Sequence, residues 1–257
     1  MNIVVYIKQT FDTEAKIVLD GSGKIDATGV NLIINPYDEY AIEEGIRLKT
    51  KFGGEVTVVT MGGARGQEAL RTSLAMGADK AVLVSDPALE NTDEWTNAEI
   101  LAKAISPIPY DIILVGRIAV DDGASQLAVR LAEVLNIPSV SSVIKLDVTD
   151  TLVAATREID GGTELIEVNL PVVITAQKGL NDPRYPTVAG IMKAKKKELK
   201  TFTLADLGFS AGDIARKMDV QKISLPSPRQ GGRLIPGDAA QAAQELARLL
   251  REEAKVL

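Results

Sequence analysis

The fold is decided by residues 110–127, YDIILVGRIAVDDGASQL. The stretch opens on the apolar run 112–115 and breaks at Gly116. A polar loop follows, and apolar residues then return at helical spacings of three and four, at Leu127, Leu131, Val134 and Leu135. This pattern predicts a buried strand, a turn and the start of a helix, and open α/β sheets bind their ligands on loops of this kind.

The composition favours an ordinary globular protein and excludes several kinds of chemistry. The chain has 257 residues, of which 46% are hydrophobic and 25% charged, and its formal net charge is −6. An acidic total disfavours a general nucleic-acid binder. Cysteine and histidine are both absent, which excludes disulfides, thiol nucleophiles, Ser-His-Asp catalysis and imidazole metal sites. We therefore expect neither a catalytic side chain nor a metal site.

The amino-terminal sequence MNIVVYIKQT lacks the pattern of a signal peptide. No apolar run approaches the roughly 20 residues that a membrane-spanning helix needs. We therefore expect a cytoplasmic protein.

Strand and helix patterns alternate through the first half of the chain. Apolar runs at 3–7, 56–60, 81–84 and 112–115 predict buried strands. Helical patterns begin after Asn35, after Ala64, at Asp93 and near Leu127. A repeated β-α order predicts a doubly wound, mostly parallel sheet of the Rossmann-like, adenine-nucleotide-binding type.

The pattern changes after about residue 140. Residues 142–148, 152–159, 164–169 and 171–176 read as strands, with a hairpin turn at Gly161-Gly162. They are expected on the same sheet or on a small antiparallel extension of it. We take residues 1–180 as the α/β nucleotide-binding domain.

Residues 181–257 are expected to form a partner-recognition loop and a carboxyl-terminal arm. Residues 191–197 are basic, and residues 225–237 are rich in proline and glycine, which predicts an extended chain. A last helix is expected from about Asp238, with an apolar face of Ala242, Leu246, Leu249 and Leu250. An arm of this kind suggests that a partner subunit covers it.

Three loops follow the strands of the first half, and in a doubly wound sheet they share the carboxyl edge. The amides of Gly123, Ala124 and Ser125 lie near a helix start and form a candidate phosphate cradle. Simple tight turns remain the alternative, because neither the dinucleotide fingerprint nor the P-loop pattern is present.

The adjacent acids Asp121 and Asp122 allow several interpretations. Acid–base catalysis or a divalent cation would use such a pair, but a solvated loop and helix cap is the commoner role. Because they would repel phosphate, we expect them to face ribose hydroxyls, backbone amides or the helix dipole. The lysines of residues 193–197 favour a solvated face or a docking patch for an acidic protein over a nucleic-acid contact.

Several long motifs resemble one family over nearly the whole chain. They read VVYIKQTFDTEAKI, IINPYDEYAIEEGIRLK, LRTSLAMGADKAVLV, GRIAVDDGASQ, REIDGGTELIEVNLPVVITAQKGLNDPRYPT and GIMKAKKKEL. In this order they resemble the β subunit of electron transfer flavoprotein. The resemblance implies one half of an αβ heterodimer that carries electrons from flavin dehydrogenases, such as the acyl-CoA dehydrogenases of fatty acid β-oxidation, to a membrane quinone reductase. It also implies FAD held mainly by the α subunit and a structural AMP on this one.

The resemblance also implies roles for particular residues. The cofactor-binding positions would be Tyr6, Asn35, Pro36, Tyr37, Asp38, Met61, Gly116, Arg117, Ile118, Ala119, Val120, Asp121, Asp122, Gly123, Ala124, Ser125, Gln126 and Leu127. Thr13 and Tyr37 would lie near the α-subunit flavin.

Residues 185–195 match the family's partner-recognition loop, with Val188, Ile191, Met192 and Lys193 as docking residues. Val188 stands where relatives often carry leucine, a loss of one methylene worth roughly 0.8 kcal/mol of burial. Lys193 and Lys196 match lysines that are methylated in some members.

The nucleotide loop departs from two family patterns. AMP-binding members read QAIDDD, whereas electron-bifurcating members with a second FAD read QAIDGDTAQ. This chain reads IAVDDGASQ. The side chain of Asp122, where the bifurcating group has glycine, favours AMP. The alternatives are a bifurcating subunit that binds FAD and NADH at this site, and a stand-alone nucleotide-binding module.

Overall fold

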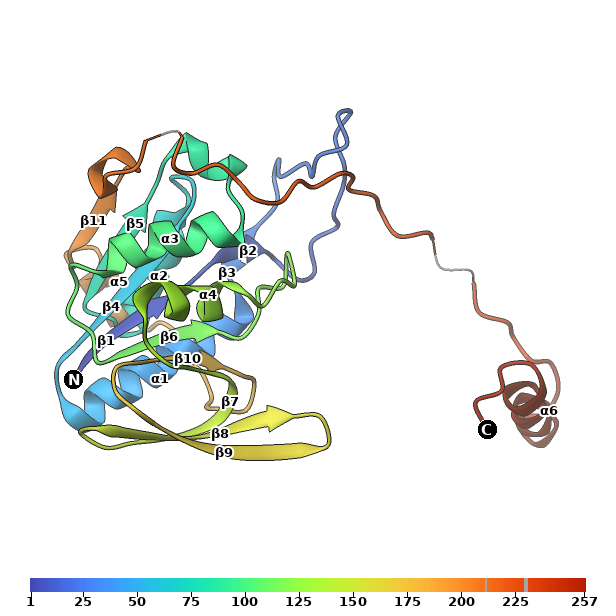
Figure 1. The fold of residues 1–257 in the computed structure, drawn as a ribbon. Coiled ribbons are helices and arrows are strands. Elements are labelled where there is room, and N and C mark those ends of the chain that lie inside the picture. Colours follow the sequence, from blue (N-terminus) through green and yellow to red (C-terminus); the bar gives the residue numbers. More distant parts are fainter. Residues whose placement is uncertain (211, 229–230) are drawn as a thin grey trace. The chain divides into compact units, whose positions relative to one another are not determined.

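One mixed sheet organises the protein in the computed structural model, which describes residues 1–210, 212–228 and 231–257. Its strand order is β11-β5-β4-β1-β6-β10-β7-β8-β9 (Figure 1). The strands are β1 (Asn2–Tyr6), β4 (Glu55–Met61), β5 (Lys80–Val84), β6 (Ile112–Gly116), β7 (Ser139–Val148), β8 (Leu152–Ile159), β9 (Gly162–Asn169), β10 (Val172–Ala176) and β11 (Leu199–Phe202). A separate antiparallel pair joins β2 (Gln9–Phe11) to β3 (Leu32–Ile34).

The strands from β11 to β7 are parallel, whereas β8 and β9 continue the sheet in antiparallel pairing. The predicted α/β class and the mostly parallel sheet are therefore confirmed. The hairpin strands after residue 140 satisfy both parts of the expectation, since they extend the same sheet and do so antiparallel.

Helices cover both faces of the sheet. They are α1 (Pro36–Phe52), α2 (Gly66–Met76), α3 (Glu94–Ile105), α4 (Leu127–Leu135) and α5 (Val188–Ala194), with short 3-10 turns η1 (Pro87–Asn91) and η2 (Ala205–Leu207). Residues of α1 and α2 pack into one hydrophobic cluster with the sheet, and residues of α3 and α4 into another on the opposite face. Each apolar stripe is thus buried against the strands beside it.

The winding of the chain reverses between β1 and β6, which are adjacent in the sheet. The connections through α1 and α2 lie on one face, and those through α3 and α4 on the other. The carboxyl ends of β1 and β6 therefore border the topological switch point, where open α/β sheets form their binding crevice.

Two elements lie where the sequence pattern indicates only an arm. The helix α5 contributes the buried Ala194 to the main core, and β11 pairs in parallel with β5, Leu199 opposite Ala81. Residues 188–202 are therefore part of the compact unit that comprises Met1–Ile17 and Ala27–Gln221.

The second unit comprises Val18–Asp26 and Lys222–Leu257. It contains a turn closed by a bridge between Leu19 and Ile25, and the helix α6 (Ala239–Glu252). Asp238 begins α6 with a capping box to Gln241, close to the predicted start. The described part of residues 225–237 forms no helix or strand, as its proline and glycine content predicts; residues 229 and 230 lie outside the described residues. None of the described helices is long and apolar enough to cross a membrane.

Candidate functional site

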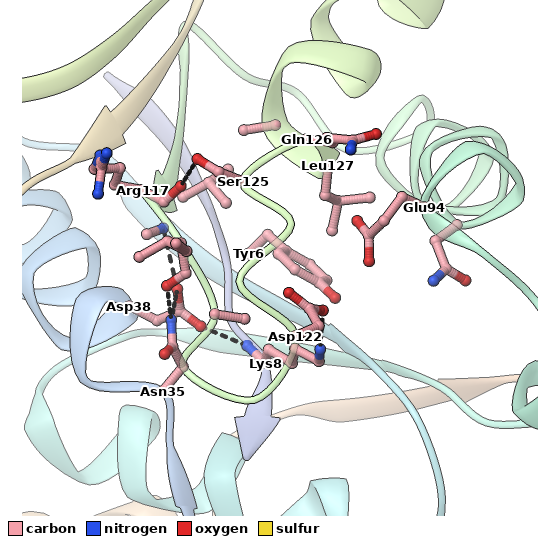
Figure 2. Close-up of a pocket in the computed structure, with 16 residues that line it drawn as sticks. Tyr6, Lys8, Asn35, Asp38, Glu94, Arg117, Asp122, Ser125, Gln126 and Leu127 are labelled. Atoms are coloured by element: carbon pink, nitrogen blue, oxygen red, sulfur yellow. Dashed lines mark hydrogen bonds and ion pairs between the residues drawn. The ribbon is translucent and has the colours of Figure 1, made fainter. Parts of the chain in front are cut away.

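A cleft opens at the switch point, between the ends of β1 and β6 (Figure 2). The loop 117–126 and the starts of α1, α3 and α4 complete its walls. The space between its walls, part of which is open to solvent, is about 530 Å³. The lining residues are Tyr6, Lys8, Asn35, Asp38, Glu94, Asn97, Val115, Gly116, Arg117, Ile118, Ala119, Asp122, Ser125, Gln126, Leu127 and Ala128.

Asp38 joins the ends of the two strands that border the cleft. Its Oδ2 accepts a hydrogen bond from the amide of Lys8 at 2.6 Å, and its Oδ1 accepts from the amide of Gly116 at 3.1 Å. The side-chain amide of Asn35 donates to the same Oδ1 at 3.0 Å. Asp38 is only 3% exposed, so its buried carboxylate links β1, α1 and β6 through hydrogen bonds.

Burial raises the pKa of Asp38 to about 7. The hydrogen bonds from Lys8, Asn35 and Gly116 act in the opposite direction, as does the charge of Lys8, because they stabilise the ionised form. All three donors are N–H groups, which suits the carboxylate.

Asn35 fixes the first part of the nucleotide loop. Its Nδ2 donates to the carbonyl of Ile118 at 2.9 Å, and its Oδ1 accepts from the amide of Val120 at 3.2 Å. Together with the bond to Asp38, these contacts engage both ends of the Asn35 amide. Asn35 and Asp38 line the cleft, but they shape its wall through protein partners.

Lys8 is a site residue that the sequence patterns did not indicate. Its ammonium binds Asp121 Oδ1 at 2.9 Å and Asp122 Oδ2 at 2.6 Å. These hydrogen bonds raise the pKa of Lys8, although burial acts to lower it. The sequence feature that could have identified Lys8 is its position directly after the buried strand of residues 3–7. This position lies at the carboxyl edge of the sheet, where the other candidate residues also lie.

The two acids also organise the loop, in agreement with the expectation that they face backbone amides. Asp121 Oδ1 accepts from the amide of Asp122 at 2.9 Å, and Asp122 Oδ1 accepts from the amide of Ala124 at 2.8 Å. The amide of Gly123 donates to the Ala119 carbonyl at 3.0 Å. Two amides of the predicted cradle are therefore used inside the loop.

The amino terminus of α4 borders the cleft without a side-chain cap. Its N-cap residue Gln126 makes no capping hydrogen bond and instead accepts from the guanidinium of Arg130 at 2.7 Å. Gln126, Leu127 and Ala128 all line the cleft. The first amides of a helix lack intrahelical acceptors and carry the positive end of its dipole, so this terminus is suited to an anionic group.

Ser125 closes the loop rather than offering a free hydroxyl. Its backbone has φ 53°, and its Oγ donates to the carbonyl of Arg117 at 2.8 Å. Arg117 in turn donates through Nε to Ser142 Oγ at 3.2 Å.

The helix α3 supplies a further wall that sequence reasoning missed. Glu94 and Asn97 line the cleft opposite the loop. Burial raises the pKa of Glu94, and the charges of Asp122 and Asp121 raise it further. Burial likewise raises the pKa of Tyr6, with Asp38 adding to the effect.

The remaining predicted site residues do not line the cleft. Val120, Asp121, Gly123 and Ala124 belong to its loop, Pro36 and Tyr37 to the first turn of α1, and Met61 to the end of β4. Thr13 is exposed in a turn after β2. In the described part of the chain no three acidic side chains gather in a way that could hold a metal ion.

The predicted docking residues form an exposed face of α5. Val188 is 82% exposed, and Ile191, Met192 and Lys193 are exposed beside it. Arg184 anchors the preceding loop through a bidentate pair with Glu43, at 2.7 and 2.8 Å.

The fold and the cleft define a doubly wound, Rossmann-like α/β protein with its site at the topological switch point. Comparison with known sequences narrows this class: the family described as "Electron transfer flavoprotein domain" matches residues 22–207. The chain is 46% identical to the electron transfer flavoprotein subunit beta of Bacillus subtilis, over 100% of both chains. It is 42% identical to that of Syntrophomonas wolfei, over 100% of this chain and 98% of the relative. The chain belongs to the electron transfer flavoprotein β-subunit family.

Another relative carries a more specific name. The "Caffeyl-CoA reductase-Etf complex subunit CarD" of Acetobacterium woodii is 36% identical, over 98% of this chain and 99% of the relative.

Proposed function

We propose that this chain, as the β subunit of an αβ electron transfer flavoprotein, holds AMP in the switch-point cleft and supports an FAD held mainly by the α subunit. The heterodimer would carry electrons from flavin dehydrogenases of the acyl-CoA type toward a membrane quinone reductase, in the cytoplasm. The observation that carries the nucleotide assignment is the uncapped amino terminus of α4 on the cleft. Its amides suit a phosphate.

The other walls of the cleft agree with a nucleoside monophosphate. Asn97 and Glu94 line the cleft and offer polar atoms for the hydroxyls of a ribose. Gly123 leaves open space on the loop, since a Cβ there would meet no atom within 4 Å. The carboxylates of Glu94 and Asp122, which also line the cleft, would repel a second phosphate. This repulsion favours AMP over a dinucleotide.

FAD would supply the electron transfer itself when bound to the complex. This chain has no cysteine or histidine, so its own residues would bind and position rather than react.

A bifurcating subunit with a second FAD and NADH remains the second candidate function. It is favoured by the likeness to CarD, a subunit of a reductase complex.

Extraction of the bound nucleotide separates the two functions. The full chain is co-expressed with its α subunit, and the denatured complex is analysed by chromatography. One FAD and one AMP per heterodimer support the proposal, whereas two FAD and no AMP support the bifurcating alternative. A complex that neither contains flavin nor accepts electrons from an acyl-CoA dehydrogenase would overturn both.

The second unit is proposed to pack on the α subunit. Leu246 of α6 is 46% exposed, and Leu234, on the chain before the helix, is 93% exposed. Such apolar groups suit a protein partner. A chain that ends at Gln221 should therefore fail to co-purify with the α subunit, while full-length chain does.

A further inference from the structure

Two carboxylates stand beside a site proposed for an anion, and Lys8 binds both. Its Nζ lies 2.9 Å from Asp121 Oδ1 and 2.6 Å from Asp122 Oδ2 (Figure 2 shows Lys8 beside Asp122). The three side chains are partly shielded from water, with 30%, 22% and 34% of their surfaces exposed. Charge-assisted hydrogen bonds of this kind are stronger than those between neutral groups.

The position of Lys8 is itself fixed. Its backbone amide, two residues after the end of β1, donates to Asp38 Oδ2 at 2.6 Å. The same Asp38 holds Gly116 at the end of β6, where the nucleotide loop begins. Lys8 thus connects the switch point, through its backbone, to the middle of the loop, through its side chain.

The charges around the cleft give this contact an electrostatic consequence. Among the residues that line the cleft, Lys8 and Arg117 are cations, and three are acids: Asp38, Glu94 and Asp122. Asp121 adds a fourth acid next to the lining. Without the charge of Lys8, these acids would repel a bound phosphate more strongly, because like charges in a partly buried site repel.

We propose that Lys8 is a positioning residue for the nucleotide: it neutralises Asp121 and Asp122, holds their carboxylates in place, and so permits a phosphate to bind at the start of α4. This inference rests on the proposed nucleotide function. It adds Lys8, which is not among the predicted cofactor-binding residues and acts through two aspartates that are.

The test separates charge from shape with three variants of the full chain, each co-purified with the α subunit. Lys8→Met removes the charge and keeps the length of the side chain. The triple variant Lys8→Met/Asp121→Asn/Asp122→Asn removes all three charges, while each asparagine Oδ1 can still accept the loop amides that Asp121 and Asp122 now bind. Lys80→Met is the matched control, since Lys80 pairs with Glu55 at 2.9 Å and lies outside the cleft lining.

Binding of AMP is measured by equilibrium dialysis after the native nucleotide has been removed. We expect Lys8→Met to bind AMP at least about tenfold more weakly, because the uncompensated charges of Asp121 and Asp122 would repel the phosphate. The triple variant should recover most of the affinity, and Lys80→Met should equal the wild type. High salt should narrow the gap between Lys8→Met and the wild type, because it screens the uncovered aspartates.

Three results would contradict the inference in different ways. Equal binding of AMP by Lys8→Met and the wild type would show that the contact between Lys8 and the two aspartates does not affect nucleotide binding. A triple variant as weak as Lys8→Met, with unchanged thermal unfolding, would show that Lys8 acts by shape and not by charge. If the wild type itself binds no AMP, the nucleotide function fails, and this inference fails with it.

Discussion

The carboxylate of Asp38 and the backbone of Gly116 are in direct contact at the switch point. The Gly116 amide donates to Asp38 Oδ1 at 3.1 Å. A Cβ built on Gly116 would lie 2.1 Å from the same oxygen and 2.8 Å from the carbonyl carbon of Tyr37. No L side chain fits there without movement, so glycine is required for the close approach of β6 to the start of α1.

Gly116→Ala should therefore destabilise the fold. Overpacking of this kind typically costs about 1–3 kcal/mol, and displacement of Asp38 should also release the bound nucleotide. Gly63→Ala is the control, because a Cβ at Gly63 meets no atom within 4 Å, and it should change stability by less than about 0.5 kcal/mol. Urea unfolding measures both, and equal stability of the two variants would contradict the close contact.

Asp38 should make stability depend on pH. Its pKa is raised from 3.8 to about 7 by burial. Between these values the folded protein binds more protons than the unfolded chain, so the free energy of unfolding falls as pH rises. The contribution is at most about 4 kcal/mol. The carboxyls of Glu39, Glu44 and Glu94, whose pKa values burial also raises, act in the same direction.

Asp38→Asn isolates the contribution of Asp38. We expect a smaller loss of stability between pH 4.5 and 8 in this variant than in the wild type, measured by urea unfolding. Asp150→Asn changes an exposed acid in the β7–β8 turn and is the control. Parallel pH profiles for Asp38→Asn and the wild type would assign the dependence to other groups.

The local parts of the fold and site were predictable from sequence, and the long-range parts were not. The apolar run before Gly116 and the helix start at Asn35-Pro36 can be recognised from neighbouring residues alone. The loops at the switch point could therefore be predicted from the sequence. β11 has four residues and depends on pairing with β5, more than a hundred positions earlier. Lys8 and Glu94 enter the cleft only because β1, α3 and the loop meet there. A pattern within one segment carries no information about such partners.

Arg184 should be important for the geometry of the recognition loop. Its guanidinium pairs with Glu43, whose side chain is 7% exposed, at 2.7 Å. Arg184→Met would leave that buried carboxylate unpaired. Because the Arg184 side chain is 45% exposed, we expect a loss of about 1–2 kcal/mol, below the range for fully buried pairs.

The double variant Arg184→Met/Glu43→Gln should regain part of this stability, since it removes the unpaired charge. Arg216→Met breaks an exposed pair with Asp219 and should have little effect. Thermal unfolding compares the three variants. A loss with Arg216→Met as large as with Arg184→Met would show that burial of Glu43 is not the cause.

Val188→Asp tests α5 as the dehydrogenase-docking element. Val188 is the first residue of the helix and is 82% exposed, so an acid there suits the helix dipole and should not disturb folding. We expect slower reduction of the complex by an acyl-CoA dehydrogenase with unchanged FAD content. Val220→Asp, at a position 72% exposed outside α5, is the control. An equal rate for both variants would place the docking surface elsewhere.

The basic segment 193–197 divides into exposed lysines and one that is structural. Lys197 donates to the carbonyls of Leu74, at 2.9 Å, and Ala78 at the end of α2. Burial lowers its pKa. Lys193 and Lys196 are exposed. Reductive methylation followed by mass spectrometry should therefore modify Lys193 and Lys196 first and Lys197 last.

The same difference should appear in stability. Lys197→Met leaves two carbonyls at a helix end without their cationic donor, and we expect a cost of about 1–3 kcal/mol. Lys196→Met, one residue away, should cost less than about 0.5 kcal/mol. Because α5 is joined to α2 through this end of the segment, with Arg71 also donating to the Ala194 carbonyl at 2.7 Å, Lys197→Met should also slow reduction by the dehydrogenase. A variant that is destabilised but reduced at the wild-type rate would separate the anchoring of α5 from its docking role.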